Sequence, residues 1–87
     1  MNHPSHKSPD YGDLQELVEE LFRGHPWDFK IERIEVVLRA ESFDLSEDLL
    51  EIVHLLPPGK YSREQLCVQL NSIIGGHAWG NTYGTVE

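Results

Sequence analysis

The sequence predicts an α+β fold that is mainly helical, with about three amphipathic helices and a small two-stranded antiparallel element. Apolar residues recur at helical spacing in three stretches, and a further stretch alternates between apolar and polar residues. An all-α fold of four helices is the alternative, because the alternating stretch also fits a helix. With 87 residues, the chain is expected to form one compact domain over 13–87 behind a flexible tail over 1–12.

The first predicted helix begins at Asp13. Asp13 is expected to cap it, with Glu16 completing a capping box, and Gly24 and Pro26 are expected to end it. The apolar residues that share one face of this helix are Leu14, Leu17, Val18 and Leu21.

The stretch 27–43 is ambiguous. Its alternating apolar positions are Ile34, Val36, Leu38 and Ala40. A helix drawn through Ile31, Ile34, Val37 and Leu38 also fits but leaves Val36 on its polar side, so a strand is favoured over 31–40. The strand formers at 83–86 would supply its antiparallel partner. Each strand needs a partner for its backbone hydrogen bonds, so the two predictions support each other.

Two more helices follow. For the first of them, Asp44 and Ser46 are candidate caps, and the two prolines and the glycine at 57–59 end the helix. Its apolar stripe consists of Leu49, Ile52, Val53 and Leu56. The last helix is predicted to be capped by Ser62 with Gln65 and closed by the glycines at 75–76. Its buried face is predicted to hold Leu66, Leu70, Ile73 and Ile74.

The formal net charge of −8 is not spread evenly along the chain. Residues 13–56 hold twelve acidic and four basic residues, which accounts for all of it. The acidic side chains either solvate the outer faces of helices or form a surface for a basic partner. In the second case the acidic face of the first helix, Glu16, Glu19 and Glu20, is the candidate contact.

The C-terminal third is neutral and rich in glycine and aromatic residues. Tyr61, Trp79 and Tyr83 form a candidate aromatic patch, because aromatic side chains dominate protein contacts and dimer seams. The alternative is that Trp79 and Tyr83 pack inward against the core.

A nucleic-acid-binding regulator is a second hypothesis. The segment 49–86 fits a helix, a tight connection, a second helix and a short hairpin, as in winged helix-turn-helix proteins. The residues that would contact nucleic acid are Lys60, Arg63, Gln65 and Gln69. The net charge of −8 disfavours this hypothesis, because nucleic-acid binding depends on neutralising phosphates.

A small thiol or metal-dependent enzyme is the third hypothesis. Cys67 is the only cysteine, and its position between apolar residues predicts a core side chain, although His54 or His77 could serve as its base. His54 is expected in the last turn of its helix, where a protonated imidazole suits the dipole. The sequence predicts no metal site in the folded region, and only the N-terminal amine with His3 could bind Cu(II) or Ni(II).

The sequence therefore predicts a small, acidic, non-enzymatic module that binds another protein or itself, as a regulator or an inhibitor. It predicts no cofactor and disfavours nucleic acid as a partner. The single cysteine and the polar N-terminus indicate the reducing cytoplasm. No apolar run approaches the roughly 18 residues that span a bilayer, so no membrane insertion is expected.

Overall fold

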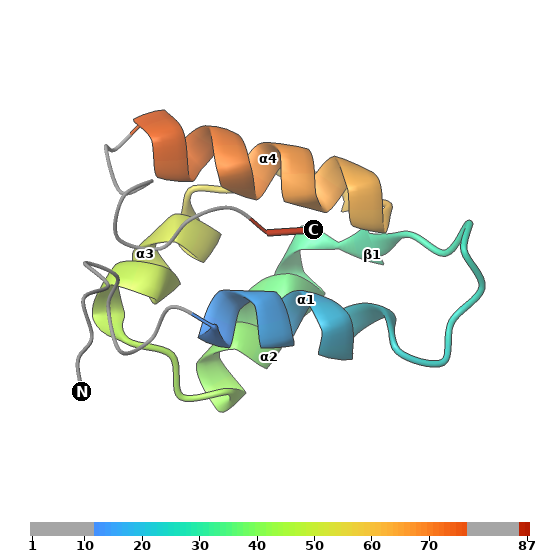
Figure 1. Cartoon of the computed structure of the whole chain (residues 1–87), viewed down its shortest axis with the longest axis horizontal. Helices are drawn as coiled ribbons and strands as arrows, with labels where there is room; N and C mark the ends of the chain where they lie inside the picture. The colour runs from blue at the N-terminus through green and yellow to red at the C-terminus, as the bar shows by residue number, and fades with distance from the viewer. Residues whose placement is uncertain (1–11, 77–85) are drawn as a thin grey trace, which may run out of the picture.

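The computed structural model describes residues 12–76 and 86–87. This described part contains four helices and a two-stranded antiparallel sheet, so the predicted mainly helical α+β class is confirmed (Figure 1). In chain order the elements are α1 (Asp13–Phe22), β1 (Ile31–Glu32), α2 (Arg33–Ser42), α3 (Glu47–His54), β2 (Lys60–Tyr61) and α4 (Arg63–Gly76). Residues 1–11 of the predicted flexible tail lie outside the described residues.

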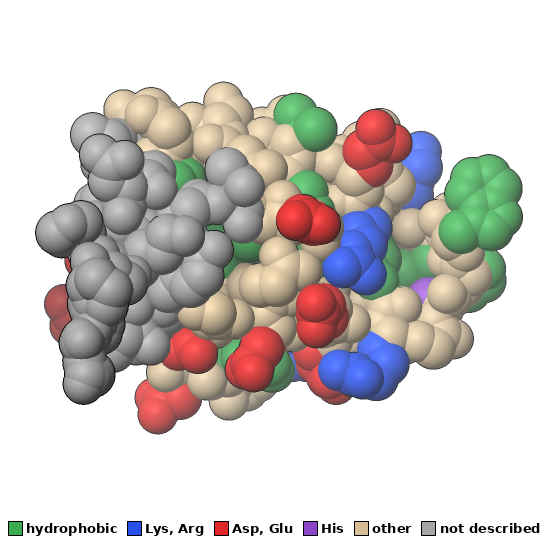
Figure 2. Space-filling view, in the orientation of Figure 1, with side chains coloured by type: hydrophobic (Ala, Val, Ile, Leu, Met, Phe, Trp, Pro, Cys, Tyr) green, Lys and Arg blue, Asp and Glu red, His purple; other side chains and the backbone are tan. Residues whose placement is uncertain are grey.

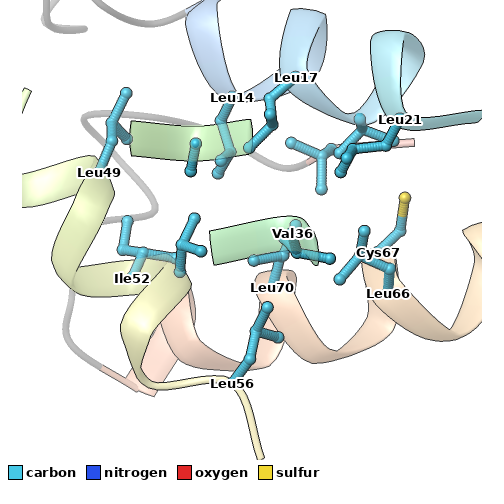
Figure 3. Packing of buried hydrophobic residues seen from close by; sticks show 14 of the residues in the cluster. Leu14, Leu17, Leu21, Val36, Leu49, Ile52, Leu56, Leu66, Cys67 and Leu70 are labelled. Atoms are coloured by element: carbon cyan, nitrogen blue, oxygen red, sulfur yellow. The ribbon is translucent and has the colours of Figure 1, made fainter. Parts of the chain in front are cut away.

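One hydrophobic core lies between the helices. The side chains of Leu14, Leu17 and Leu21 on α1 face Leu66 and Leu70 on α4, with Val36 of α2 between them (Figure 3). Other core residues are Val18, Ile31, Val37, Ala40, Leu45, Leu49, Ile52, Val53, Leu56, Tyr61, Cys67, Ile74 and Val86. Within the described ranges, no polar or charged side chain is buried. The two predicted apolar stripes are buried in this core, and of their eight residues only Leu56 lies outside its helix, just after the end of α3 at His54.

The start of α1 differs from the prediction. The N-cap is Gly12, whose carbonyl oxygen accepts a hydrogen bond from the Glu16 amide at 3.0 Å, and no side chain caps the helix. Asp13 is the first helical residue rather than the cap. There its carboxylate still lies near the positive end of the helix dipole.

The predicted strand over 31–40 is wrong beyond its first two residues. Residues 33–42 form α2, which buries Val36, Val37 and Ala40 at helical spacing. Ile34 and Leu38, which made the apolar alternation look regular, are 53% and 57% exposed. An alternating pattern therefore arose because α2 carries apolar residues on two faces, only one of which packs on the core.

The partner of β1 is also not the predicted one. Ile31 pairs with Tyr61 and Glu32 with Lys60, directly after the turn made by 57–59. The Arg33 amide then donates to the carbonyl oxygen of Gly59 at 3.0 Å, which extends the pairing into the start of α2. Residues 83–85 of the predicted C-terminal strand lie outside the described residues, and Val86 is not in a strand.

Both later helices begin as predicted. The Ser46 hydroxyl accepts a hydrogen bond from the Leu49 amide and so caps α3. At α4, the Ser62 amide donates to the Gln65 side chain and the Gln65 amide donates to the Ser62 hydroxyl, which is the predicted capping box. The glycines at 75–76 do not follow α4 but are its last two residues. Its predicted apolar face is buried at Leu66, Leu70 and Ile74 and partly buried at Ile73.

Candidate functional site

A groove of about 600 Å³ lies between α4, the loop 23–30 and the segment 86–87. It is lined by Trp27, Asp28, Lys30, Ser62, Arg63, Glu64, Cys67, Val68, Asn71 and Glu87. Its volume falls in the range of sites that hold small molecules or protruding side chains of a partner.

Trp27 lines this groove, and 92% of its surface is exposed. No other large hydrophobic side chain in the described part of the chain is as exposed. It sits on the loop 23–30, which projects beyond the ends of α1 and α4 (Figure 1). Exposure of one tryptophan on a projecting loop is unusual, because burial of an indole is strongly favourable.

The loop that carries Trp27 is held in shape by local contacts. The Phe29 amide donates to the carbonyl oxygen of Pro26 at 3.0 Å, which closes a turn with Trp27 near its tip. The ring of His25 stacks on Phe29 at 3.8 Å, and Phe22 meets Phe29 edge to face at 6.1 Å. The position of Trp27 is therefore set by its neighbours, while its own side chain makes no core contact.

The apolar floor of the groove comes from α4. Val68 is 59% exposed there, and Cys67 beside it is buried. Burial raises the pKa of the Cys67 thiol above its ordinary value, while nearby Arg63 acts in the opposite direction and Glu87 adds to the rise. The thiol is thus kept protonated and behaves as a small apolar group, as the sequence predicts.

Glu87 also lines the groove, and side chains of α1 and α4 hold the segment 86–87 in place. Asn71 of α4 pairs with the backbone of Val86, donating to its carbonyl oxygen at 3.0 Å and accepting from its amide at 2.8 Å. Gln15 of α1 does the same for Glu87, at 3.1 and 2.9 Å. The Arg63 guanidinium also donates two hydrogen bonds to the Glu87 carbonyl oxygen. Two amide side chains and one arginine therefore tie this segment to both α1 and α4.

The three residues of the predicted acidic face share the outer side of α1. Glu16 and Glu19 are exposed. Glu20 is partly covered and lies 3.2 Å from Arg23 and 3.5 Å from Arg39, so part of its charge is neutralised. Acidic side chains are spread over the face that carries α1, with basic ones toward the end where loop 23–30 projects (Figure 2).

The structure does not bring the predicted aromatic patch together within its described residues. Tyr61 is only 7% exposed, and its hydroxyl donates to the carbonyl oxygen of Pro57. Tyr61 is therefore a core residue and not a surface anchor. Trp79 and Tyr83 lie outside the described residues.

Of the residues of the nucleic-acid hypothesis, Lys60 lies in β2, and Arg63, Gln65 and Gln69 lie in the first half of α4. Lys60, Arg63 and Gln65 are exposed, and Gln69 is partly covered. Two of them already have structural roles, because Arg63 binds the Glu87 carbonyl oxygen and Gln65 forms the capping box. The side chain of Lys60, in contrast, makes none of the hydrogen bonds described above.

Metal and catalytic candidates are few. In 12–76 and 86–87 no three His, Cys, Asp or Glu side chains are grouped in a way that could hold a metal ion. His54 ends α3, as predicted, and lies 3.5 Å from Glu41 of α2. His3 and His77 lie outside the described residues. Within those same ranges, the structure has no helix whose length and hydrophobicity would allow it to cross a membrane.

Sequence reasoning missed Trp27. One signal was available, since Trp27 falls between Pro26 and Asp28 and outside the apolar periodicity of both neighbouring helices. A tryptophan that no stripe accounts for is a candidate surface residue. Comparison of the chain with known protein families, with curated proteins and with solved structures found no match.

Proposed function

We propose that this chain is a small non-enzymatic protein-binding module, acting as a regulator or inhibitor, and that the groove beside Trp27 is its contact surface. The exposure of Trp27 carries the proposal, because a few large aromatic side chains supply most of the affinity of typical protein interfaces. Val68 adds apolar surface at the floor of the groove. Lys30, Arg63, Asp28 and Glu64 at the edge can supply polar contacts that orient a partner.

The compartment we propose is the reducing cytoplasm. The only cysteine is a free, buried thiol, which agrees with a compartment in which disulfides are rare.

The acidic face of α1 is a second candidate surface. Glu16 and Glu19 are exposed and belong to a helix that contains no lysine or arginine. Such a surface would attract a basic partner and steer its approach. Binding through this face would weaken steeply with salt, whereas binding through an apolar groove would depend on salt much less.

Capture of partners from an extract of the cells that make the protein tests both surfaces. The tagged wild-type chain is compared with Trp27→Ala and with the triple reversal of Glu16, Glu19 and Glu20 to Lys. Leu38→Ala is the matched control, because Leu38 is an exposed apolar residue of α2 outside the groove. We expect Trp27→Ala to lose the captured proteins and Leu38→Ala to retain them.

Each other result has a definite meaning. If only the triple reversal loses the captured proteins, the acidic face is the contact and the groove is not. If Trp27→Ala captures the same proteins as the wild type, the groove is excluded. If the chain instead retards DNA at low salt, and changing Lys60 and Arg63 abolishes the effect, the nucleic-acid hypothesis replaces this one.

A further inference from the structure

We propose that the occupant of the groove beside Trp27 is a second copy of this chain, so that two chains form a two-fold symmetric dimer. This inference rests on the proposed function, whose contact surface it adopts and whose partner it names. Trp27 and the exposed side chain of Val68 both line this one groove.

A protruding side chain beside a hollow makes a surface complementary to itself. In a two-fold dimer every contact occurs twice: if one residue of the first copy contacts a second residue of the partner, the same pair also meets with the copies exchanged. Trp27 of each copy can therefore enter the groove of the other and cover Val68. Both indoles, each 92% exposed in a single chain, would be removed from water in one step.

The charges around the groove suit contact between two identical chains. Lys30 and Arg63 stand there with Asp28, Glu64 and Glu87, so the lining is close to neutral and holds both signs. The chain as a whole carries −8. Two copies that meet at this groove can place basic groups of one against acidic groups of the other.

The outer sides of α1 and α3 suit such contact less well. The outer side of α1 holds Glu16 and Glu19, and that of α3 holds Glu47 and Glu51, while neither helix contains a lysine or an arginine. Two copies meeting at α1 or α3 would bring like charges together, which costs affinity.

Association at the groove should lose little conformational entropy and break few hydrogen bonds. The turn closed by Phe29 and Pro26 and the stack of His25 on Phe29 hold the loop before any partner arrives. The polar groups of Arg63 and Asn71 already bind the backbone of 86–87. Covering the groove therefore leaves these groups paired, which avoids the penalty for burying unsatisfied donors.

Analytical ultracentrifugation over a concentration series tests the proposal with the full chain. The wild-type chain should form dimers, and Trp27→Ala should weaken the dimer roughly 30-fold or more, as loss of an interface hot spot does. Val68→Glu, which places a charge on the groove floor, should do the same. The controls are Leu38→Ala and Leu38→Glu, which make the same changes at an exposed position of α2. Both controls should retain the dimer, and far-UV circular dichroism checks that every variant folds.

Charge supplies an independent test. Lys30→Glu should weaken the dimer, whereas Lys60→Glu, with the same change in net charge but outside the groove lining, should weaken it much less.

Three results would overturn the proposal. The first is a wild-type chain that remains monomeric throughout the series. The second is a dimer that both Trp27→Ala and Val68→Glu leave intact. The third is a dimer that Lys60→Glu weakens as much as Lys30→Glu does. The proposed function would survive the first result if Trp27-dependent capture of a different protein is found, and it would fail with this inference if Trp27→Ala changes neither association nor capture.

Discussion

Individual aromatic residues in this chain have environments that their identity does not predict. Tyr61 is buried because its backbone pairs with Ile31 in the small sheet, where the side chain turns toward the core. Trp27, the more hydrophobic residue, is exposed because the turn that carries it projects from the helices. Position within the fold, and not hydrophobicity, decides which of these rings is available to a partner.

The thiol of Cys67 should react slowly in the folded chain. The thiolate is the reactive form, and burial raises the pKa of this group, so little thiolate exists at neutral pH. We expect iodoacetamide to label the folded chain at pH 7 much more slowly than the chain unfolded in urea. Mass spectrometry of timed samples measures both rates. Equal rates would revive the thiol-enzyme hypothesis.

The same raised pKa predicts a pH dependence of stability. The folded chain holds the thiol proton more tightly than the unfolded chain does, so this contribution is complete below the ordinary thiol pKa of about 8.5. The free energy of unfolding should then fall as the pH rises above that value and through the raised pKa. Urea denaturation between pH 7 and 10 measures the decline, and Cys67→Ala should make it shallower.

At the scale of elements, α2 and α3 are joined by an interaction that neither stretch of sequence indicates. Arg33, the first residue of α2, donates from Nε to the Leu56 carbonyl oxygen at 2.6 Å and from Nη2 to the His54 carbonyl oxygen at 2.8 Å. These carbonyls lie at the C-terminal end of α3, where backbone acceptors lack helical partners and the dipole favours a cation. The arginine therefore caps α3 from another helix.

Replacing this arginine should lower stability. We expect Arg33→Ala to reduce the free energy of unfolding by about 1 to 3 kcal/mol, since it removes two hydrogen bonds from a charged donor. The matched control is Arg23→Ala, which removes an exposed ion pair with Glu20 and should cost less than about 1 kcal/mol. Equal losses in urea denaturation of the two variants would contradict the capping role.

At the scale of the whole molecule, the acidic charge and the groove occupy different surfaces. The helices α1 and α3 carry outward acidic residues and no lysine or arginine, while the groove beside Trp27 is lined by residues of both signs. Repulsion among the acidic residues opposes the compact state, and salt screens it. The attractive pairs of Glu20 with Arg23 and Arg39 are exposed and contribute little.

Adding salt should therefore stabilise the folded chain. We expect the melting temperature to rise by a few degrees between low salt and about 0.5 M NaCl, as differential scanning calorimetry would measure. Reversing Glu16, Glu19 and Glu20 to Lys changes the formal net charge from −8 to −2, because each reversal adds two charges. The salt effect should be smaller in that variant. A melting temperature that falls with salt would mean that attractive pairs dominate.

Much of the helical architecture follows from the sequence alone. The stripes of α1 and α3 and the capping box at Ser62 were predictable because they depend on residues three or four positions apart. The mainly helical α+β class also follows from the sequence, but the pairing of Ile31 with Tyr61 in the sheet does not. Of the candidate site, the sequence indicates exposed Glu16 and Glu19, and Cys67 as a core residue.

The rest depends on contacts between residues far apart in the chain. Alternation at 34–41 fits a strand or a helix with two apolar faces, and only packing on the core selects α2. The groove exists because α4 meets the loop of Trp27 and the backbone of 86–87. Asn71 binds Val86, which is 15 residues away in the sequence, and Gln15 binds Glu87, which is 72 residues away. The spacing of apolar residues indicates which face of a single helix is buried. A binding surface forms where separate elements meet, and their arrangement depends on the tertiary structure.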